Sequence, residues 1–102
     1  MNDSLFSVKD QVVLVSGASR GIGKAIAKGF ADREATVIIT GRNQETLAQT
    51  AAELAANRGN VHPKVCDAAN KADLDTLVEE IVAEFGRIDT LVNCAGVNKR
   101  MP

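Results

Sequence analysis

Four short apolar runs recur along the chain at intervals of roughly 25 residues, near the length of a strand with its crossover helix. They are Val12–Val15, Thr36–Thr40, Val61–Val65 and Ile88–Val92. The first two are rich in β-branched residues and do not alternate with polar ones, a pattern typical of strands buried on both faces. The third is weaker because a histidine, a proline and a lysine interrupt it, and the fourth contains an aspartate and a threonine. We expect all four runs to form strands.

Helical patterns fill the three intervals between these runs. Apolar residues recur at steps of three and four in the stretches Ile22–Phe30, Leu47–Ala55 and Leu74–Phe85. Strands that alternate with helices predict an α/β fold with a parallel sheet, right-handed crossovers and helices on both faces. The sequence shows no internal repeat, low-complexity tract or linker, so residues 1–102 are expected to form one continuous unit.

Asparagine and glycine residues mark the expected helix boundaries. Asn43 and Asn70 precede the second and third helical stretches, where asparagine is a favoured N-cap. Gly59 and Gly86 follow the same two stretches, and glycine often ends a helix in the left-handed conformation.

The segment between the first strand and the first helix, Ser16–Gly23, is rich in glycine. A dinucleotide diphosphate is bound by main-chain N–H donors at the positive end of a helix, where no Cβ stands in its way. Gly17 allows a tight turn out of the strand, Gly21 opens the helix, and Gly23 allows close packing on the sheet. An ordinary glycine-rich turn is the alternative, but the position at a strand–helix junction favours a dinucleotide site.

Two other nucleotide-binding patterns are not met. A P-loop that ends at Gly23-Lys24 needs a glycine where Ala18 stands and a magnesium-binding hydroxyl where Ala25 stands. A methyltransferase-like site usually has an acidic residue at the end of the second strand to hold the ribose hydroxyls, and this chain has none there.

The spacing Gly-x-x-x-Gly-x-Gly, with Ser16 directly before its first glycine, resembles the signature of the short-chain dehydrogenase/reductase family. After the fourth strand, Asn93-Cys94-Ala95-Gly96 is similar to the family's Asn-Asn-Ala-Gly motif, with Cys94 in place of the second asparagine. Asp67 follows the third strand, where the family has an aspartate near the adenine. The resemblance extends from Gln11 to Pro102 and implies a Rossmann-type sheet, of which the chain holds the first four β–α units.

The end of the second strand indicates which nicotinamide cofactor is preferred. NAD-specific sites usually have Asp or Glu there, which accepts hydrogen bonds from the adenosine ribose. Gly41 stands at that position and Arg42 follows it, and a guanidinium binds a 2′-phosphate that a carboxylate would repel. Arg20 is a second candidate cation. In the family such a pair of arginines implies NADP(H) rather than NAD(H); a solvated loop arginine is the alternative for each.

The resemblance and the positions at the strand ends together give the expected cofactor contacts. These are Gly17, Ser19, Arg20, Gly21, Ile22 and Gly23 at the phosphates, Arg42 at the 2′-phosphate, Asp67 and Ala68 at the adenine edge, and Asn93, Ala95 and Gly96 on the nicotinamide side. They follow the carboxyl ends of parallel strands, where ligands bind in open α/β sheets. For Asp67, a role in a turn or a helix cap is the alternative.

The resemblance implies hydride transfer between nicotinamide and a small alcohol or carbonyl substrate, with a serine and a Tyr-x-x-x-Lys pair as catalytic groups. The tyrosine acts as a general acid whose pKa the lysine lowers. The chain contains no tyrosine and ends at Pro102, before a fifth strand. We therefore expect a truncated chain that binds cofactor, holds no catalytic residue and is inactive alone. His62 is expected to be structural or at the surface, and Cys66 and Cys94 to be small core residues.

Truncation after the fourth strand would leave an open sheet edge, which favours association or aggregation. For the full-length protein, the resemblance implies a homo-oligomer, either a dimer or a tetramer.

Composition narrows the function classes further. Among 102 residues, 13 acidic and 12 basic side chains nearly balance and form no run of like charge, which argues against nucleic-acid or membrane partners. No apolar stretch is long enough to span a bilayer, the start has no signal-peptide pattern, and the two cysteines lack metal-ligand spacing. We therefore expect a cytoplasmic location and no metal.

Two functions remain open: the cofactor-binding part of an NADP-dependent alcohol dehydrogenase or ketoreductase, and an inactive nucleotide-binding module. The substrate is hardly specified. Val97–Arg100 resembles members that act on sugar acids such as gluconate, but a solvated loop explains these residues too, and an acyl thioester is an equal competitor. Glu34 stands where the family commonly has glycine, which puts the geometry of that turn in question.

Overall fold

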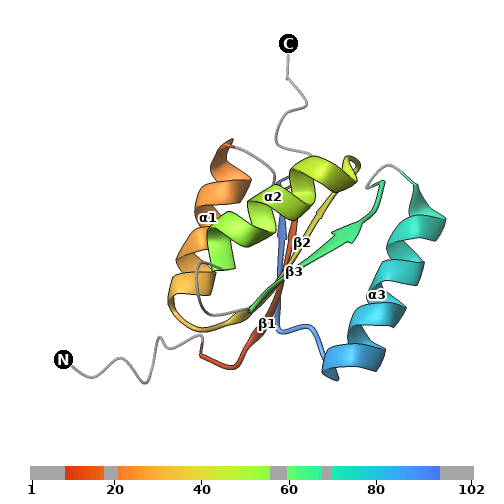
Figure 1. Ribbon diagram of the computed structural model, residues 1–102. Helices are drawn as coiled ribbons and strands as arrows, with labels where there is room; N and C mark the ends of the chain where they lie inside the picture. The colour runs from red at the N-terminus through yellow and green to blue at the C-terminus, as the bar shows by residue number, and fades with distance from the viewer. Residues whose placement is uncertain (1–8, 18–20, 56–59, 68–69, 95–102) are drawn as a thin grey trace, which may run out of the picture.

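Strands and helices alternate along the whole described chain (Figure 1). The computed structural model describes residues 9–17, 21–55, 60–67 and 70–94. The elements are β1 (Val12–Ser16), α1 (Gly21–Asp32), β2 (Thr36–Gly41), α2 (Gln44–Ala55), β3 (Val61–Val65), α3 (Lys71–Phe85) and β4 (Thr90–Asn93). The alternation expected from the apolar pattern is confirmed, including the interrupted third strand.

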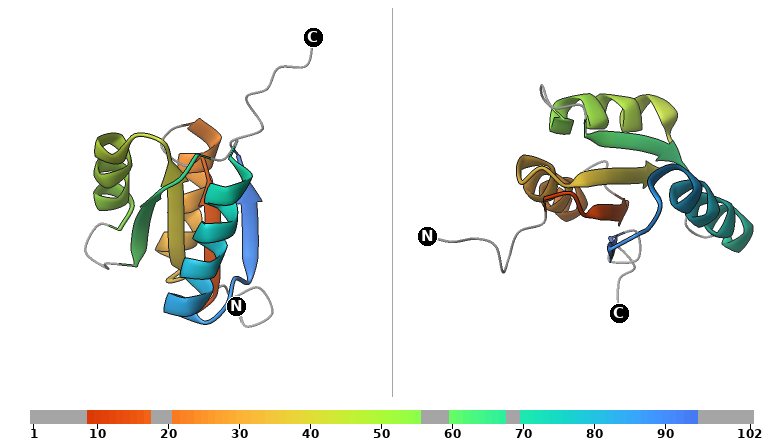
Figure 2. Two further views of the ribbon diagram at one scale, coloured as in Figure 1. Left: turned by 90° about the vertical axis from the view of Figure 1, so that its right-hand side faces the viewer. Right: turned by 90° about the horizontal axis from the view of Figure 1, so that it is seen from below.

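The strands form one parallel sheet in the order β3-β2-β1-β4. Helices α1 and α2 cover one face of this sheet and α3 covers the other (Figure 1, Figure 2). This is the Rossmann-type α/β arrangement that the sequence predicts. The chain moves outward from β1 to β2 and β3 and then returns to the other side of β1, so the strand order reverses between β1 and β4. Ligands of open α/β sheets bind beyond the strand ends at such a reversal.

Each face of the sheet has its own apolar core. Val13 and Val15 of β1 belong to the core beneath α1 and α2. Val12 and Leu14 belong to the core beneath α3, together with residues such as Leu77. Because β1 has a helical layer on both sides, all five of its residues are buried. The absence of alternation in its sequence has this physical cause.

The start of β4 differs from the sequence expectation. We expected a strand over Ile88–Val92, whereas β4 spans Thr90–Asn93. Ile88 is partly buried and packs against the core beneath α3. The Asp89 carboxylate accepts the Val12 N–H at 2.8 Å, so this residue binds β1 through its side chain as well as its main chain. An apolar run alone does not reveal that contact, because Val12 is distant in sequence.

The predicted helix caps are confirmed where the structure describes them. The Asn43 carboxamide oxygen accepts the Thr46 N–H at 2.9 Å, and Asn70 caps α3. Gly86 ends α3 in the left-handed conformation, with φ of 90°. Gly59 lies outside the described residues.

Candidate functional site

The glycine turn leaves β1 in a conformation that favours glycine. Gly17 has φ of 81°, and its N–H donates to the Thr40 carbonyl of β2 at 3.1 Å, which anchors the turn to the neighbouring strand. Gly21, the first residue of α1, has φ of 66°. Counting the described residues only, a Cβ at Gly21 would meet no atom within 4 Å. Its backbone conformation, and not crowding, therefore requires glycine, and the space beside it is open.

The N-terminus of α1 is suited to an anion. The N–H groups of a first helical turn have no intrahelical acceptor and carry partial positive charge. The first turn of α1 contains no acidic residue. Ile22 is 64% exposed there, and Gly23 is buried. Lys24 forms an ion pair with Glu53 of α2. Its ammonium therefore does not point toward a phosphate site as a P-loop lysine does.

The strand register brings three carboxyl ends to one edge of the sheet. Ser16 is in register with Thr40 of β2 on one side and with Asn93 of β4 on the other. The Cys94 N–H donates to the Ser16 carbonyl at 2.9 Å, which continues the contact one residue beyond β4. Asn93 is exposed. The glycine turn and the end of β4 therefore lie next to each other.

Arg42 is the first residue after β2 and is exposed. Among the residues that the structure describes, no carboxylate pairs with its guanidinium. Its neighbour Asn43 has its side-chain oxygen occupied by the α2 cap. At Gly41, a Cβ would approach the Leu47 Cδ1 to 3.4 Å, a distance that a small shift of this side-chain end accommodates. Within residues 40–43, at the end of β2, Arg42 is the charged residue, and Glu45 follows in the first turn of α2.

The segment after β3 lies beside the end of β2. The Cys66 N–H donates to the Gly41 carbonyl at 2.9 Å. Burial raises the pKa of the Cys66 thiol, and the charges of Asp73 and Asp67 raise it further. This thiol is therefore protonated and acts as a small core residue, as expected from the sequence. Asp67 follows it, half-buried, at the same edge as Arg42.

The other residues considered for chemistry have structural surroundings. The His62 ring packs against the Phe85 ring with centroids 5.0 Å apart, which agrees with the structural role expected for it. Cys94 is buried and has no disulfide partner. No three His, Cys, Asp or Glu side chains of the described segments gather as in a metal site. In the same segments, no helix has the length and apolar character needed to cross a membrane.

The structure assembles part of the expected site. At the carboxyl edge of the sheet lie Gly17, Gly21, Ile22, Gly23, Arg42, Asp67 and Asn93. Outside the described residues lie Ser19, Arg20, Ala68, Ala95 and Gly96. Sequence reasoning missed two supports of this edge: the Thr40 carbonyl, which gives no sequence signal, and Asp73, whose spacing from Asn70 is that of a capping box.

These residues fit a dinucleotide chemically. A diphosphate needs N–H donors at a helix N-terminus without a nearby carboxylate, and the open space at Gly21 beside α1 meets that need. The exposed cation at Arg42 matches an additional phosphate on the adenosine. The contacts themselves stay a prediction.

Comparisons with known proteins agree with this geometry. A family model described as short chain dehydrogenase matches residues 11–102. The D-threitol dehydrogenase of Mycolicibacterium smegmatis is 40% identical over 97 residues, which are 95% of this chain and 37% of that protein. The chain thus spans little more than a third of this relative.

Solved structures give the same result. The crystal structure of 2-keto-3-deoxy-D-gluconate dehydrogenase from Streptococcus agalactiae has a TM-score of 0.82 and 36% identity, over 95% of this chain and 36% of that chain. A metagenomic short-chain oxidoreductase in complex with NADP has a TM-score of 0.79 and 35% identity, over 83% of this chain and 38% of that chain.

Proposed function

The chain belongs to the short-chain dehydrogenase family, and on this premise we propose that it is the NADP(H)-binding part of an oxidoreductase. The longer protein would transfer hydride between nicotinamide and a small alcohol or carbonyl substrate, and would be a homo-oligomer. One observation carries the proposal: the open glycine turn at the N-terminus of α1 lies at the same sheet edge as the exposed guanidinium of Arg42.

In this proposal each part of the edge has a separate task. The main chain from Gly17 to Gly23 binds the diphosphate, because helix N–H groups are already oriented toward an anion. The end of β4, with Asn93, would lie on the nicotinamide side, and Asp67 at the adenine edge. When bound, the nicotinamide ring donates or accepts the hydride, and the residues of this chain hold the cofactor in place.

Arg42 provides the preference for NADP(H). A guanidinium forms paired, charge-assisted hydrogen bonds with a phosphate, each worth about 1.5–3 kcal/mol. Gly41 contributes by lacking the carboxylate that would accept from a ribose hydroxyl and repel a 2′-phosphate. The similar metagenomic oxidoreductase bound to NADP supports this choice.

The general acid of the reaction is placed outside these residues. The chain contains no tyrosine, so the Tyr-x-x-x-Lys pair of the family has no counterpart in it. The second candidate is an inactive nucleotide-binding module, which would use the same glycine turn and Arg42. If the longer reading frame continues into Tyr-x-x-x-Lys, the protein is an enzyme and the first candidate is correct.

For the substrate, the names of two similar proteins, a threitol and a keto-deoxygluconate dehydrogenase, favour a polyhydroxylated alcohol or sugar acid. Turnover of polyols and sugar acids by the longer protein, and none of acyl thioesters, is the expected result.

Titration with both reduced cofactors tests the cofactor proposal. The protein is expected to bind NADPH at least tenfold more tightly than NADH. Arg42→Ala should weaken NADPH binding by about 10- to 100-fold, because the variant loses a charge-assisted contact. NADH binding should stay unchanged in this variant.

The matched control is Arg33→Ala, because Arg33 is exposed at the other end of α1, where its guanidinium donates to the Gly29 carbonyl. This variant should bind NADPH like the unsubstituted protein. Tighter binding of NADH by the unsubstituted protein would overturn the NADP(H) preference.

A further inference from the structure

A chain of hydrogen bonds connects the start of α3 with Asp67. The Asn70 side-chain oxygen accepts the Asp73 N–H at 3.1 Å, which is the usual N-cap bond. The Asn70 N–H donates to the Asp67 carbonyl at 2.9 Å. The Asp73 carboxylate accepts the Asp67 N–H at 3.3 Å. Asp67 is therefore held through both of its main-chain polar groups, by the N-cap residue and by the first turn of α3.

This arrangement differs from an ordinary capping box. In that motif the side chain three residues after the N-cap reaches back to the N–H of the N-cap residue itself. Here the Asn70 N–H already has the Asp67 carbonyl as its acceptor, and Asp73 reaches three residues further back. Helix stability alone does not require this bond, since the Asp67 N–H does not belong to the helix.

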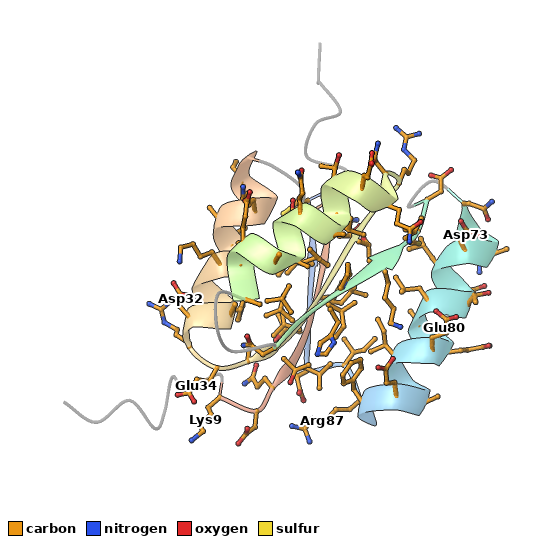
Figure 3. All side chains as sticks on the ribbon, in the orientation of Figure 1. Lys9, Asp32, Glu34, Asp73, Glu80 and Arg87 are labelled. Atoms are coloured by element: carbon orange, nitrogen blue, oxygen red, sulfur yellow. The ribbon has the colours of Figure 1, made fainter. Side chains whose placement is uncertain are left out.

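The adjoining residue fixes the other side of the same segment. The Cys66 N–H donates to the Gly41 carbonyl at the end of β2, and the Cys66 side chain is buried beneath α3. Asp67 thus stands between a contact to the sheet and a contact to the helix. Asp73 lies at the start of α3, at the end of the molecule where the strands terminate (Figure 3).

We propose that Asp73 is a positioning residue for the adenine end of the cofactor site, acting through Asp67; this inference rests on the proposed function. A carboxylate orients an adenine amino group only if its own main chain is held, because a mobile acceptor loses conformational entropy on binding. Asp73 supplies this order before the cofactor arrives. Its effect therefore depends on the amino group of the base, whereas a purely structural role would not.

Binding of NADPH and of its deamino analogue, in which a carbonyl oxygen replaces the adenine amino group, tests the inference. Asp73→Ala is expected to weaken NADPH binding by about three- to tenfold, as the loss of one hydrogen bond would. Binding of the deamino analogue should change by less than about twofold, because it offers Asp67 no amino donor. Asp73→Asn should bind NADPH like the unsubstituted protein, since its carboxamide oxygen still accepts the Asp67 N–H.

Asp75→Ala is the matched control. Asp75 lies on the same helix and pairs with Lys71 at 3.2 Å, with both side chains exposed. It should leave both affinities unchanged. Asp73→Ser, which keeps a helix-compatible polar residue but lacks the carboxylate, replaces the alanine variant if that variant does not fold.

The outcomes separate the two proposals. Equal weakening of NADPH and its deamino analogue, or equal behaviour of the Asp73 and Asp75 variants, overturns the positioning role alone. No NADPH binding by the unsubstituted protein overturns the proposed function and this inference with it.

Discussion

Glu34 adopts a left-handed backbone conformation, with φ of 69°, in the turn between α1 and β2. Its N–H donates to the Ala31 carbonyl at 3.0 Å and its carbonyl accepts the Asp10 N–H at 3.3 Å, so the turn is fixed by its main chain. A side chain with a Cβ is strained in this conformation by roughly 1–2 kcal/mol. The turn between α1 and β2 therefore keeps a conformation that favours glycine, and Glu34 adopts it with backbone strain.

Glu34→Gly is therefore expected to stabilise the fold. Glycine removes the strain but makes the unfolded chain more flexible, which leaves a net gain of about 0.5–1 kcal/mol in the free energy of unfolding. Urea denaturation with an unchanged m-value measures it. Asp10→Gly is the control: Asp10 has φ of 71°, but aspartate tolerates this conformation better, so the gain should be smaller. A destabilised Glu34→Gly variant would contradict the account.

At the scale of elements, the α3–β4 connection is tied to the start of β1. The Asp89 carboxylate accepts from the Val12 N–H and from the Arg87 Nε, each at 2.8 Å. The Arg87 Nη2 donates to the Asp10 carbonyl at 2.9 Å. Figure 3 shows Arg87 at the end of the molecule opposite Asp73. These bonds fix the register of β4 on β1, and with it the position of Asn93.

Asp89→Ala should destabilise the protein in a pH-dependent way. The hydrogen bond from Arg87, followed by that from the Val12 N–H, lowers the pKa of Asp89. Its contribution to stability is therefore complete above the unfolded-state pKa, about 3.9, and is lost as the pH falls through the lower folded-state pKa. Urea denaturation should show that the variant has a lower free energy of unfolding than the unsubstituted protein at pH 7. This difference in free energy should become smaller below pH 4.

The control for this prediction is Asp75→Ala, which removes an exposed ion pair within one helix and should have little effect at either pH. If the difference in free energy of unfolding between Asp89→Ala and the unsubstituted protein stayed constant with pH, the pH dependence would not come from the Asp89 carboxylate.

The extent of sequence prediction follows from the range of each interaction. Val13 and Ile38 lie in β-branched runs, so β1 and β2 are predictable locally, as is the cap at Asn43. The predicted start of β4 is wrong, because the true start depends on the contact between Asp89 and Val12, which are far apart in sequence. In the site, the glycine motif predicts the turn at Gly17, and the end of the second apolar run predicts the position of Arg42. The bond from Asp67 to Asp73 appears only when the chain is folded.

At the scale of the whole molecule, the two edges of the sheet differ. β3 and β4 are the edge strands of the described sheet. β3 contains Pro63 and Lys64, and proline and lysine are residues that protect an edge against pairing. β4 consists of uncharged residues. Leu91 is in register with Leu14 of the core beneath α3 and is 63% exposed. The β4 edge is therefore the one prone to pair with another strand.

The 102-residue polypeptide is expected to self-associate through this edge, and Leu91→Lys should weaken association at least about tenfold. Sedimentation equilibrium over a range of concentrations measures it. Val65→Lys is the matched control, because Val65 is also exposed, at 54%, but lies on the protected β3 edge. A stable monomer without substitution, or equal effects of both variants, would count against the prediction.

The most direct test of the account is an NADPH titration followed by the amide resonances of the folded protein. We expect the largest shifts from Gly17 and from Gly21 to Gly23, with Arg42 also affected, while residues at the opposite end of the sheet, such as Glu34, stay unmoved. Saturating NADPH that leaves the glycine-turn amides in place would contradict the central claim that this turn binds the diphosphate.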